Sequence, residues 1–318
     1  MIDLRPALLV LGFMLVALSI SMCVPAIVDF TISNPDWKVF LFSAALGLFI
    51  GITLILTNRT QDFHLSIREA VVMTLLIWTV LPFFASIPFM YSDLSLSLTD
   101  AYFESMSGLT TTGSTVISGL DTAPPGILIW RAFLQWFGGL GIIVMSISIL
   151  PMLRIGGSQM FKVEAFDVAG RDTPRMAKIS AGITLVFIGS TSVCAIALWL
   201  AGMSGLEACV HAMTTIATGG YSTSDASITH FDSPLIEAII TLGMIFGGIP
   251  FLLYLRCFQG HFKRLLRDSQ VRVYLGILFF SSLALSGWLV LTKGFGLLDA
   301  LRYAPFSVVS IMTGTGYA

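Results

Sequence analysis

The sequence has few charged residues. Lysine, arginine, aspartate and glutamate make up 11% of its 318 residues, whereas a soluble domain usually carries about 25%. Apolar residues make up 56%, and the mean hydropathy is +0.90. So few charges cannot cover a core of this size with a surface that water solvates. The composition therefore excludes a soluble globular protein and predicts an integral membrane protein.

The sequence also lacks the patterns of a metal site, a disulfide framework or a common enzyme. The four histidines are scattered, and no paired spacing is found among the four cysteines, Cys23, Cys194, Cys209 and Cys257. HExxH, Walker-type and dinucleotide motifs are absent, and no nucleophile constellation is evident. His211 lies in an apolar segment, where we interpret it as a packed or capping residue rather than a ligand. We expect no enzyme and no organic cofactor.

Seven apolar runs are long enough to cross the ~30 Å hydrocarbon core of a bilayer as helices. They cover residues 7–28, 39–57, 67–90, 126–153, 176–201, 234–258 and 271–291. The first run lacks a convincing small-residue cleavage site, so we interpret it as a retained helix rather than a signal peptide. The predicted fold class is an all-α membrane protein with about seven transmembrane helices.

Basic residues are distributed unevenly between the connecting segments. With a cytoplasmic N-terminus, 13 of the 17 lysines and arginines lie on the inner side, as the positive-inside rule requires. Eleven of the 18 acids lie on the outer side. A negative outer face raises the local concentration of cations. The alternative is that the charge of the outer face merely reflects the positive-inside rule. We predict a multi-pass protein with its N-terminus in the cytoplasm.

A threonine- and glycine-rich stretch interrupts the apolar sequence three times. The stretches FESMSGLTTTGST, VHAMTTIATGGYS and FSVVSIMTGTGYA are in register when aligned on Gly113, Gly220 and Gly316. A hydroxyl residue stands six positions before each glycine, namely Ser107, Thr214 and Ser310. Each stretch follows a spanning helix that runs outward. The pattern predicts repeats of helix, short helix, loop and helix over 67–174, 175–268 and 269–318, after a pair of helices in 1–66.

The segment before the first loop is too short to cross the membrane. A helix from Thr99 to Leu109, with Thr99 as its N-cap, would span only ~16 Å. Non-helical backbone at that depth must be buried in protein or line a water-filled cavity. The C-terminal ends of such half-helices direct their negative dipole ends inward. We therefore expect three re-entrant pore helices whose loops favour a cation.

The composition of the loops fits coordination by the backbone. Stacked carbonyl oxygens can replace the hydration shell of a potassium ion. Glycine allows the backbone angles that aim successive carbonyls the same way, and threonine stiffens its neighbour and adds a hydroxyl. We predict an ion-selective filter in which Tyr221 and Tyr317 brace the loops. The pore helices are expected to be steadied by Ser107, Thr214 and Ser310.

With these motifs, spacings and orientations the chain resembles, nearly end to end, the Trk/Ktr/HKT superfamily of potassium transporters, and within it the bacterial Trk systems. The resemblance maps the filter glycine of the family onto Gly113, Gly220 and Gly316. Members that admit sodium often carry serine at the first of these, so Gly113 favours potassium. The implied potassium ligands are the backbone carbonyls of Thr110, Thr111, Thr112, Gly113, Ala217, Thr218, Gly219, Gly220, Thr313, Gly314, Thr315 and Gly316.

The resemblance also implies a location and partners. It implies potassium uptake across the bacterial inner membrane, gated by a cytosolic TrkA-type nucleotide-binding regulatory subunit, in a homodimer with one pore per protomer. The docking surface would be the cytoplasmic segments that begin at Arg154 and Arg256, which are otherwise solvated connectors or contacts with anionic lipid. The family has four repeats, so a sequence ending after the third filter is expected to be a fragment.

The sequence leaves two interpretations of several residues, and it allows one alternative function. FGGLG at Phe137 and FGGIP at Phe246 indicate close helix packing or, with Pro250, a hinge. Arg131 is expected to snorkel or pair with an acid, whereas Glu104 and Glu207 are expected to attract cations. The rival is an ion-coupled symporter of potassium or sodium. That class shows inverted repeats, whereas successive units here enter with the same orientation.

Overall fold

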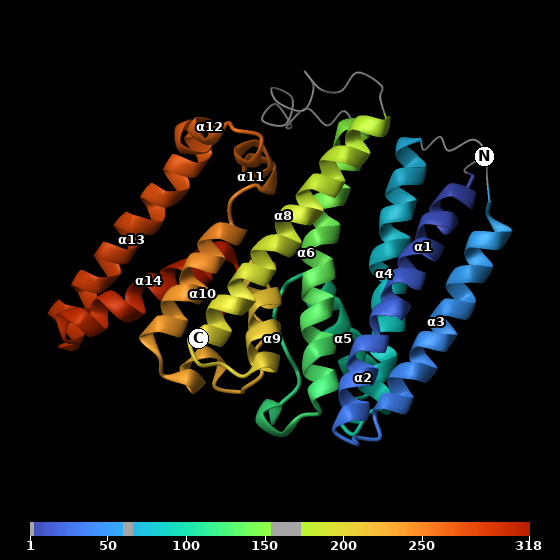
Figure 1. Ribbon diagram of the computed structural model, residues 1–318, viewed down its shortest axis with the longest axis horizontal. Helices are drawn as coiled ribbons and strands as arrows, with labels where there is room; N and C mark the ends of the chain where they lie inside the picture. Colours follow the sequence, from blue (N-terminus) through green and yellow to red (C-terminus); the bar gives the residue numbers. More distant parts are fainter. Residues whose placement is uncertain (1–2, 60–65, 154–172) are drawn as a thin grey trace. The chain divides into compact units, whose positions relative to one another are not determined.

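The computed structural model describes residues 3–59, 66–153 and 173–318, and no β-strand occurs among them. It divides into two compact units (Figure 1). The N-terminal unit comprises Met1–Thr110, Ser114–Leu134 and Gly141–Arg171; the C-terminal unit comprises Thr111–Gly113, Gln135–Leu140 and Asp172–Ala318. The cytoplasmic segment from Arg154 that was predicted to dock a partner lies outside the described residues up to position 172.

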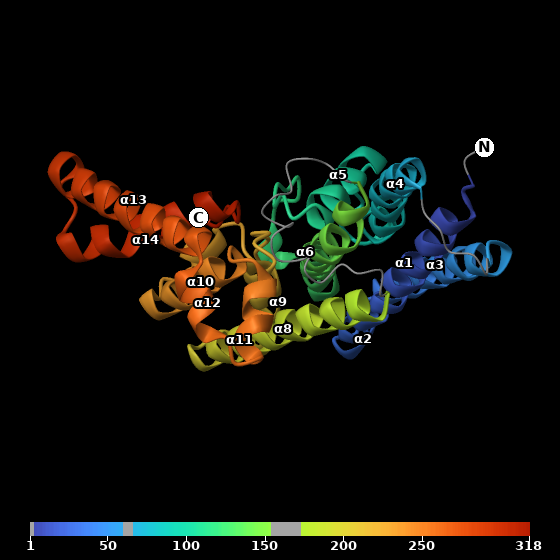
Figure 2. The same cartoon turned by 90° about the horizontal axis from the view of Figure 1, so that it is seen from above.

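The N-terminal unit is a group of helices around an apolar core. Its helices are α1 (Arg5–Ser21), α2 (Cys23–Thr31), α3 (Trp37–Thr57), α4 (Ile67–Tyr91), α5 (Leu98–Leu109) and α6 (Pro125–Leu153) except for its segment Gln135–Leu140. The short helix η1 (Leu120–Thr122) precedes α6. Helix α1 packs against α3 and α4, and α4 packs against α5 (Figures 1 and 2). The core includes the buried side chains of Leu15, Phe40, Phe89 and Trp130.

The C-terminal unit contains the remaining helices. They are α8 (Thr173–Leu200), α9 (Gly205–Ile216), η2 (Ser227–Phe231), α10 (Pro234–Gly247), α11 (Phe251–Phe258), α12 (Phe262–Arg267), α13 (Ser269–Lys293) and α14 (Leu297–Thr313). Helix α10 packs against α8, α9 and α14, and α13 packs against α14. The C-terminal end of the chain returns to η2, where the Ala318 carbonyl accepts from the Ile228 N–H at 3.0 Å.

Six helices among the described residues are long and apolar enough to cross a membrane. The first of them, Arg5–Thr31, is interrupted at Met22, because Pro25 has no N–H to donate to the carbonyl one turn earlier. The sixth predicted span is not one straight helix but the pair α10 and α11, bent by 92°. Counting this broken pair as one span, the structure agrees with the predicted number of seven.

The bend shows which of the two FGG motifs lies at a break in its helix. In the second copy α10 ends at Gly247, and Pro250 stands immediately before α11. In the first copy α6 continues as a helix through Phe137 and beyond. A proline lacks the donor that would continue the helical ladder, so only the copy with Pro250 bends.

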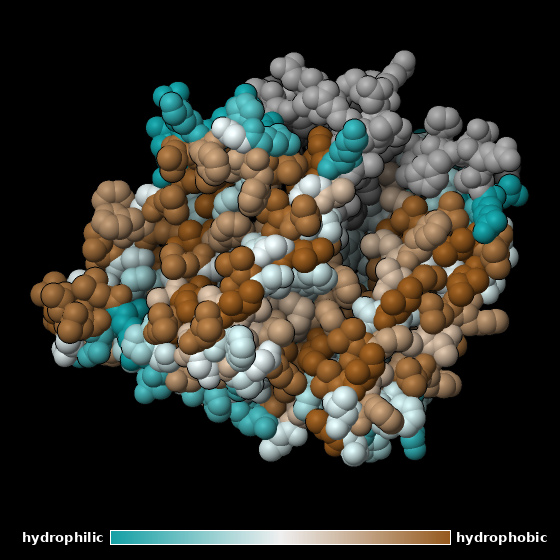
Figure 3. Space-filling model, viewed as in Figure 1, coloured by the Kyte–Doolittle hydropathy of each residue, from teal (hydrophilic) through white to brown (hydrophobic). Residues whose placement is uncertain are grey.

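The surface of the spanning helices is apolar. Figure 3 shows hydrophobic side chains over α13 and its neighbours and hydrophilic side chains near α12. Leu185, Val193, Trp199, Phe280 and Leu291 are at least 60% exposed. So extensive an apolar surface is not typical of a monomeric soluble protein, which agrees with a multi-pass membrane protein.

Three shorter helices precede the polar loops. Helices α5, α9 and α14 have 12, 12 and 17 residues. The predicted N-cap of α5 at Thr99 is wrong by two positions. Ser97 is extended and its side chain accepts from the Asp100 N–H, so the helix begins at Leu98 and Thr99 is already inside it.

Candidate ion-binding site

The tips of the three polar loops meet within the C-terminal unit. Gly113 lies against the carbonyl oxygen of Gly219, and Gly220 lies against that of Thr315. A side chain on either glycine would overlap the facing oxygen. The structure thus brings residues 111–113, 217–220 and 313–316 into one unit, while Thr110 belongs to the N-terminal unit.

The three loops share one backbone conformation. In each, the filter glycine and the residue two positions before it have positive φ: 54° and 80° at Thr111 and Gly113, 51° and 81° at Thr218 and Gly220, and 75° and 78° at Gly314 and Gly316. A change in the sign of φ from one residue to the next turns successive carbonyls toward the same side. A β-branched residue rarely adopts positive φ, at a cost of about 1–2 kcal/mol. Strain of this kind is found mainly at functional sites.

The helices before the loops add a favourable field for a cation. Each of α5, α9 and α14 has an acid in its first turn, Asp100, Glu207 or Asp299, and none has a basic residue in its last turn. The negative end of each helix dipole adjoins its loop and is not neutralised by a basic residue of that turn. An anion would be repelled from the same position.

Hydroxyl groups fasten two of the loops to their own pore helices. Ser107 Oγ donates to the Ser114 carbonyl at 2.6 Å, and Ser310 Oγ donates to the Tyr317 carbonyl at 2.7 Å. In the second repeat Thr214 instead bonds the Val210 carbonyl and the Tyr317 hydroxyl. The first and third residues therefore hold the loop after the filter glycine, a more specific role than steadying the helix.

A second contact repeats in register behind the loops. A polar residue stands nine positions before the filter glycine. It forms a hydrogen bond with a hydroxyl residue that stands two positions after the same glycine. Thr115 Oγ1 donates to Glu104 at 2.9 Å, and His211 Nε2 shares a hydrogen bond with Ser222 Oγ at 3.1 Å. His211 is fully buried, and its Nδ1 is 2.8 Å from the Glu207 carbonyl. The prediction of a packed histidine is confirmed.

The two glutamates on the pore helices differ in burial: Glu104 is fully buried and Glu207 is partly exposed. Glu104 Oε1 lies 2.8 Å from Arg131 Nε, with both side chains at most 1% exposed. Glu207 accepts from the Ser204 N–H in a capping box. The prediction of cation attraction is wrong for Glu104, because its carboxylate is buried against Arg131. For Glu207, which is partly exposed, it stays a prediction. The alternative that Arg131 pairs with an acid is confirmed.

The FGG glycines are packing positions against the loops. Gly139 lies against Ala217, and Gly248 lies against the Tyr274 side chain and next to the Thr313 methyl group, so the second glycine of each copy adjoins the first residue of a filter loop. Gly247 meets the Ile216 carbonyl and Thr218. Small residues permit this close approach, which supports the packing interpretation in both copies.

One residue that contacts the loops, Gln135, was not predicted from the sequence. Gln135 is fully buried on α6. Its Nε2 donates to the Gly219 carbonyl at 2.6 Å, and its Oε1 accepts from the Tyr221 N–H at 3.1 Å. The available signal was a lone amide in an otherwise apolar spanning helix, where a polar side chain is costly unless it has partners.

Tyrosines brace the loops as predicted in the third repeat. Tyr317 is buried, and its hydroxyl bonds Thr214 and Thr215 of the second pore helix. Tyr221 is buried as well. These contacts join the third loop to the helix that carries the second.

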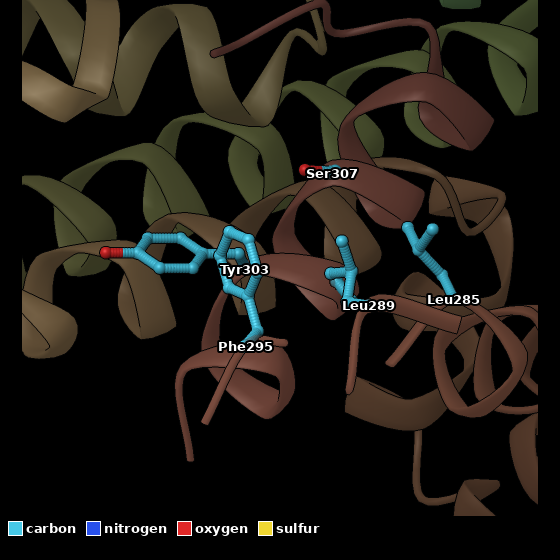
Figure 4. Close-up of a pocket in the computed structure, with 6 residues that line it drawn as sticks. Leu285, Leu289, Phe295, Tyr303 and Ser307 are labelled. Carbon is cyan, nitrogen blue, oxygen red and sulfur yellow. The ribbon is translucent and has the colours of Figure 1, made fainter. Parts of the chain in front are cut away.

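A pocket of ≈ 540 Å³ between α13 and α14 is unsuited to a bare cation (Figure 4). It is lined by Leu285, Leu289, Phe295, Tyr303, Ala304 and Ser307. An apolar lining cannot replace the hydration shell of an ion. Within the described residues, no group of three or more histidines, cysteines or acids could hold a metal ion.

The buried ion pair yields a stability prediction. Glu104→Gln leaves the buried Arg131 guanidinium without its carboxylate, which costs about 3–5 kcal/mol of folding free energy. The matched change Asp232→Asn removes a carboxylate that is 85% exposed beside Arg302, and should alter stability little. Thermal unfolding in detergent compares the two variants. Equal melting temperatures would contradict a structural role for the Glu104–Arg131 pair.

Comparison with known proteins places the chain in a family. Residues 38–304 match the TrkH family, described as cation transport protein. The Trk system potassium uptake protein TrkI of Halomonas elongata is 39% identical over 98% of this chain and 64% of its own length. The Trk system potassium uptake protein TrkH of Escherichia coli K12 is 37% identical over 97% of this chain and 65% of its own.

A solved structure agrees with the sequence match. The crystal structure of the potassium transporter TrkH from Vibrio parahaemolyticus superposes with a TM-score of 0.89 at 36% identity, covering 98% of this chain and 64% of that one. The chain therefore spans just under two thirds of the length of these relatives. On the family match and the shared fold, the chain belongs to the TrkH family of cation transport proteins.

Proposed function

We propose that the protein takes up potassium across the bacterial inner membrane through a filter lined by backbone carbonyls. The ligands are the carbonyls of residues 110–113, 217–220 and 313–316. One observation carries the proposal: three loops with the same alternation of φ meet at the C-terminal ends of three short helices. Convergent carbonyls in a negative helix field bind a cation and exclude an anion.

Potassium is favoured as the ion by two further points. The relatives are named potassium uptake proteins. In addition, members of the Trk/Ktr/HKT superfamily that admit sodium often have a serine at the position that Gly113 occupies here. Loops that line a path for an ion need no catalytic groups. The proposed function is therefore transport rather than catalysis. A symporter of potassium or sodium is the alternative, and it requires that uptake depend on a second ion gradient.

We further propose that a cytosolic TrkA-type nucleotide-binding subunit gates the path, and that the active form of the protein is a homodimer. The described part of the proposed docking face is the segment from Arg256 to Arg272. Here Lys263, Arg264 and Arg267 are exposed on or beside the short helix α12. A basic, exposed surface suits an acidic protein partner, because complementary charges accelerate association.

Rubidium uptake tests the function directly. Proteoliposomes containing the product of the gene should accumulate rubidium, a potassium analogue, and added nucleotide-binding subunit should change the rate. Potassium should compete with rubidium, and a tenfold excess of sodium should not. Uptake that requires an inwardly directed proton or sodium gradient would support the symporter. No uptake by folded protein with the subunit present would contradict potassium transport.

Gly113→Ser tests the filter. At φ 80° a serine side chain is strained and would overlap the Gly219 carbonyl oxygen, so the loop must shift and the oxygen cage must change its size. We expect the potassium-to-sodium uptake ratio to fall about tenfold or more, for a distortion of at least ~1.4 kcal/mol. Gly294→Ser is the matched control, since Gly294 also has positive φ but no neighbour within 4 Å. An unchanged ratio in Gly113→Ser would count against the filter assignment.

A further inference from the structure

Gln135 joins the second filter loop to a helix outside its own repeat. The residue lies on α6, in the part of that helix that belongs to the C-terminal unit, and its side chain is fully buried. Its amide nitrogen donates to the Gly219 carbonyl at 2.6 Å, and its amide oxygen accepts from the Tyr221 N–H at 3.1 Å. One side chain therefore bridges the residues on either side of the filter glycine Gly220.

The contact between α6 and this loop extends over one helical turn. Gly139, four residues after Gln135 and on the same helix face, lies against Ala217 at the start of the loop. Gly219 has no side chain, and one would overlap the Gln135 amide. The loop is thus packed on α6 at its beginning and hydrogen-bonded to α6 at its end.

The second loop differs from the other two in how its end is held. In the first and third loops the carbonyl just after the filter glycine accepts from a serine on the same pore helix, Ser107 or Ser310. The corresponding Thr214 directs its hydroxyl to Val210 and Tyr317. Gln135 also holds the residue after the filter glycine, but through a different group: it accepts from the Tyr221 N–H, whereas the two serines donate to the carbonyl at the equivalent position.

An amide suits this position because it donates and accepts at the same time without carrying a charge. Gly220 has φ 81°, and glycine moves readily between backbone regions. Holding both neighbouring peptide groups fixes the direction of the carbonyls around it. The spacing and direction of carbonyl oxygens govern discrimination between potassium and sodium.

We propose that Gln135 is a positioning residue that sets the ion selectivity of the second filter loop from the preceding repeat. The proposal rests on the proposed function, in which this loop forms one wall of the filter. Gln135 acts through Gly219 and Tyr221 and does not itself bind the ion.

Two substitutions separate this role from simple packing. Gln135→Met has a similar size but neither donor nor acceptor, and Gln135→Asn keeps the amide on a shorter side chain that cannot span both partners. Each should lower the potassium-to-sodium uptake ratio at least about fivefold, the effect of one net hydrogen bond. The control is Thr53→Val, at an exposed threonine of α3 whose hydroxyl donates to the Phe49 carbonyl of its own helix, which should leave the ratio unchanged.

The measurement is paired rubidium and sodium uptake into proteoliposomes, with folding checked by gel filtration and thermal unfolding. Lower rates for both ions at an unchanged ratio would show a merely structural residue and overturn the proposal, as would failure of both variants to fold. Because wild-type protein is measured in parallel, its inactivity would instead defeat the proposed function. A selective wild type with equally selective variants would defeat only the role of Gln135.

Discussion

Backbone amide and carbonyl groups cannot remain unsatisfied in lipid, and this constraint organises the protein. Spanning helices meet it internally, whereas the three loops after α5, α9 and α14 leave the helical hydrogen-bond ladder. The loops are held by donors from neighbouring groups: the Ser107 and Ser310 hydroxyls and the Gln135 amide. Thr111 and Thr218 keep their strained positive φ because these hydrogen bonds, and the close contacts at the facing glycines, restrict the other conformations that the loop backbone could adopt.

The repeats agree in backbone conformation and differ in the side chains that support it. A polar residue nine positions before the filter glycine bonds a hydroxyl two positions after it in both the first and the second repeat, but it is Glu104 in one and His211 in the other. The first repeat adds the buried Arg131, and the second borrows Gln135 from α6. Different side chains thus support three loops that share one alternation of φ.

Much of the fold could be predicted from composition and register. Apolar length predicted the spans, and alignment on Gly113, Gly220 and Gly316 predicted the loops, because both signals are local. Pro250 indicated a possible hinge at the position where the helix breaks between α10 and α11. By contrast, Glu104 was misinterpreted because a carboxylate near the outer face resembles a cation attractor until its distant partner Arg131 is known. Gln135 was missed for the same reason, since its partners lie 84 and 86 positions along the chain.

The central claim is that the carbonyls of these three loops bind the transported cation. An X-ray structure of the gene product grown in rubidium, with anomalous data at the rubidium edge, tests it most directly. The account predicts anomalous density bounded by carbonyl oxygens of residues 111–113, 217–220 and 313–316, and its loss when sodium replaces rubidium. Density only elsewhere, or none beside these loops in a well-ordered crystal, would contradict it.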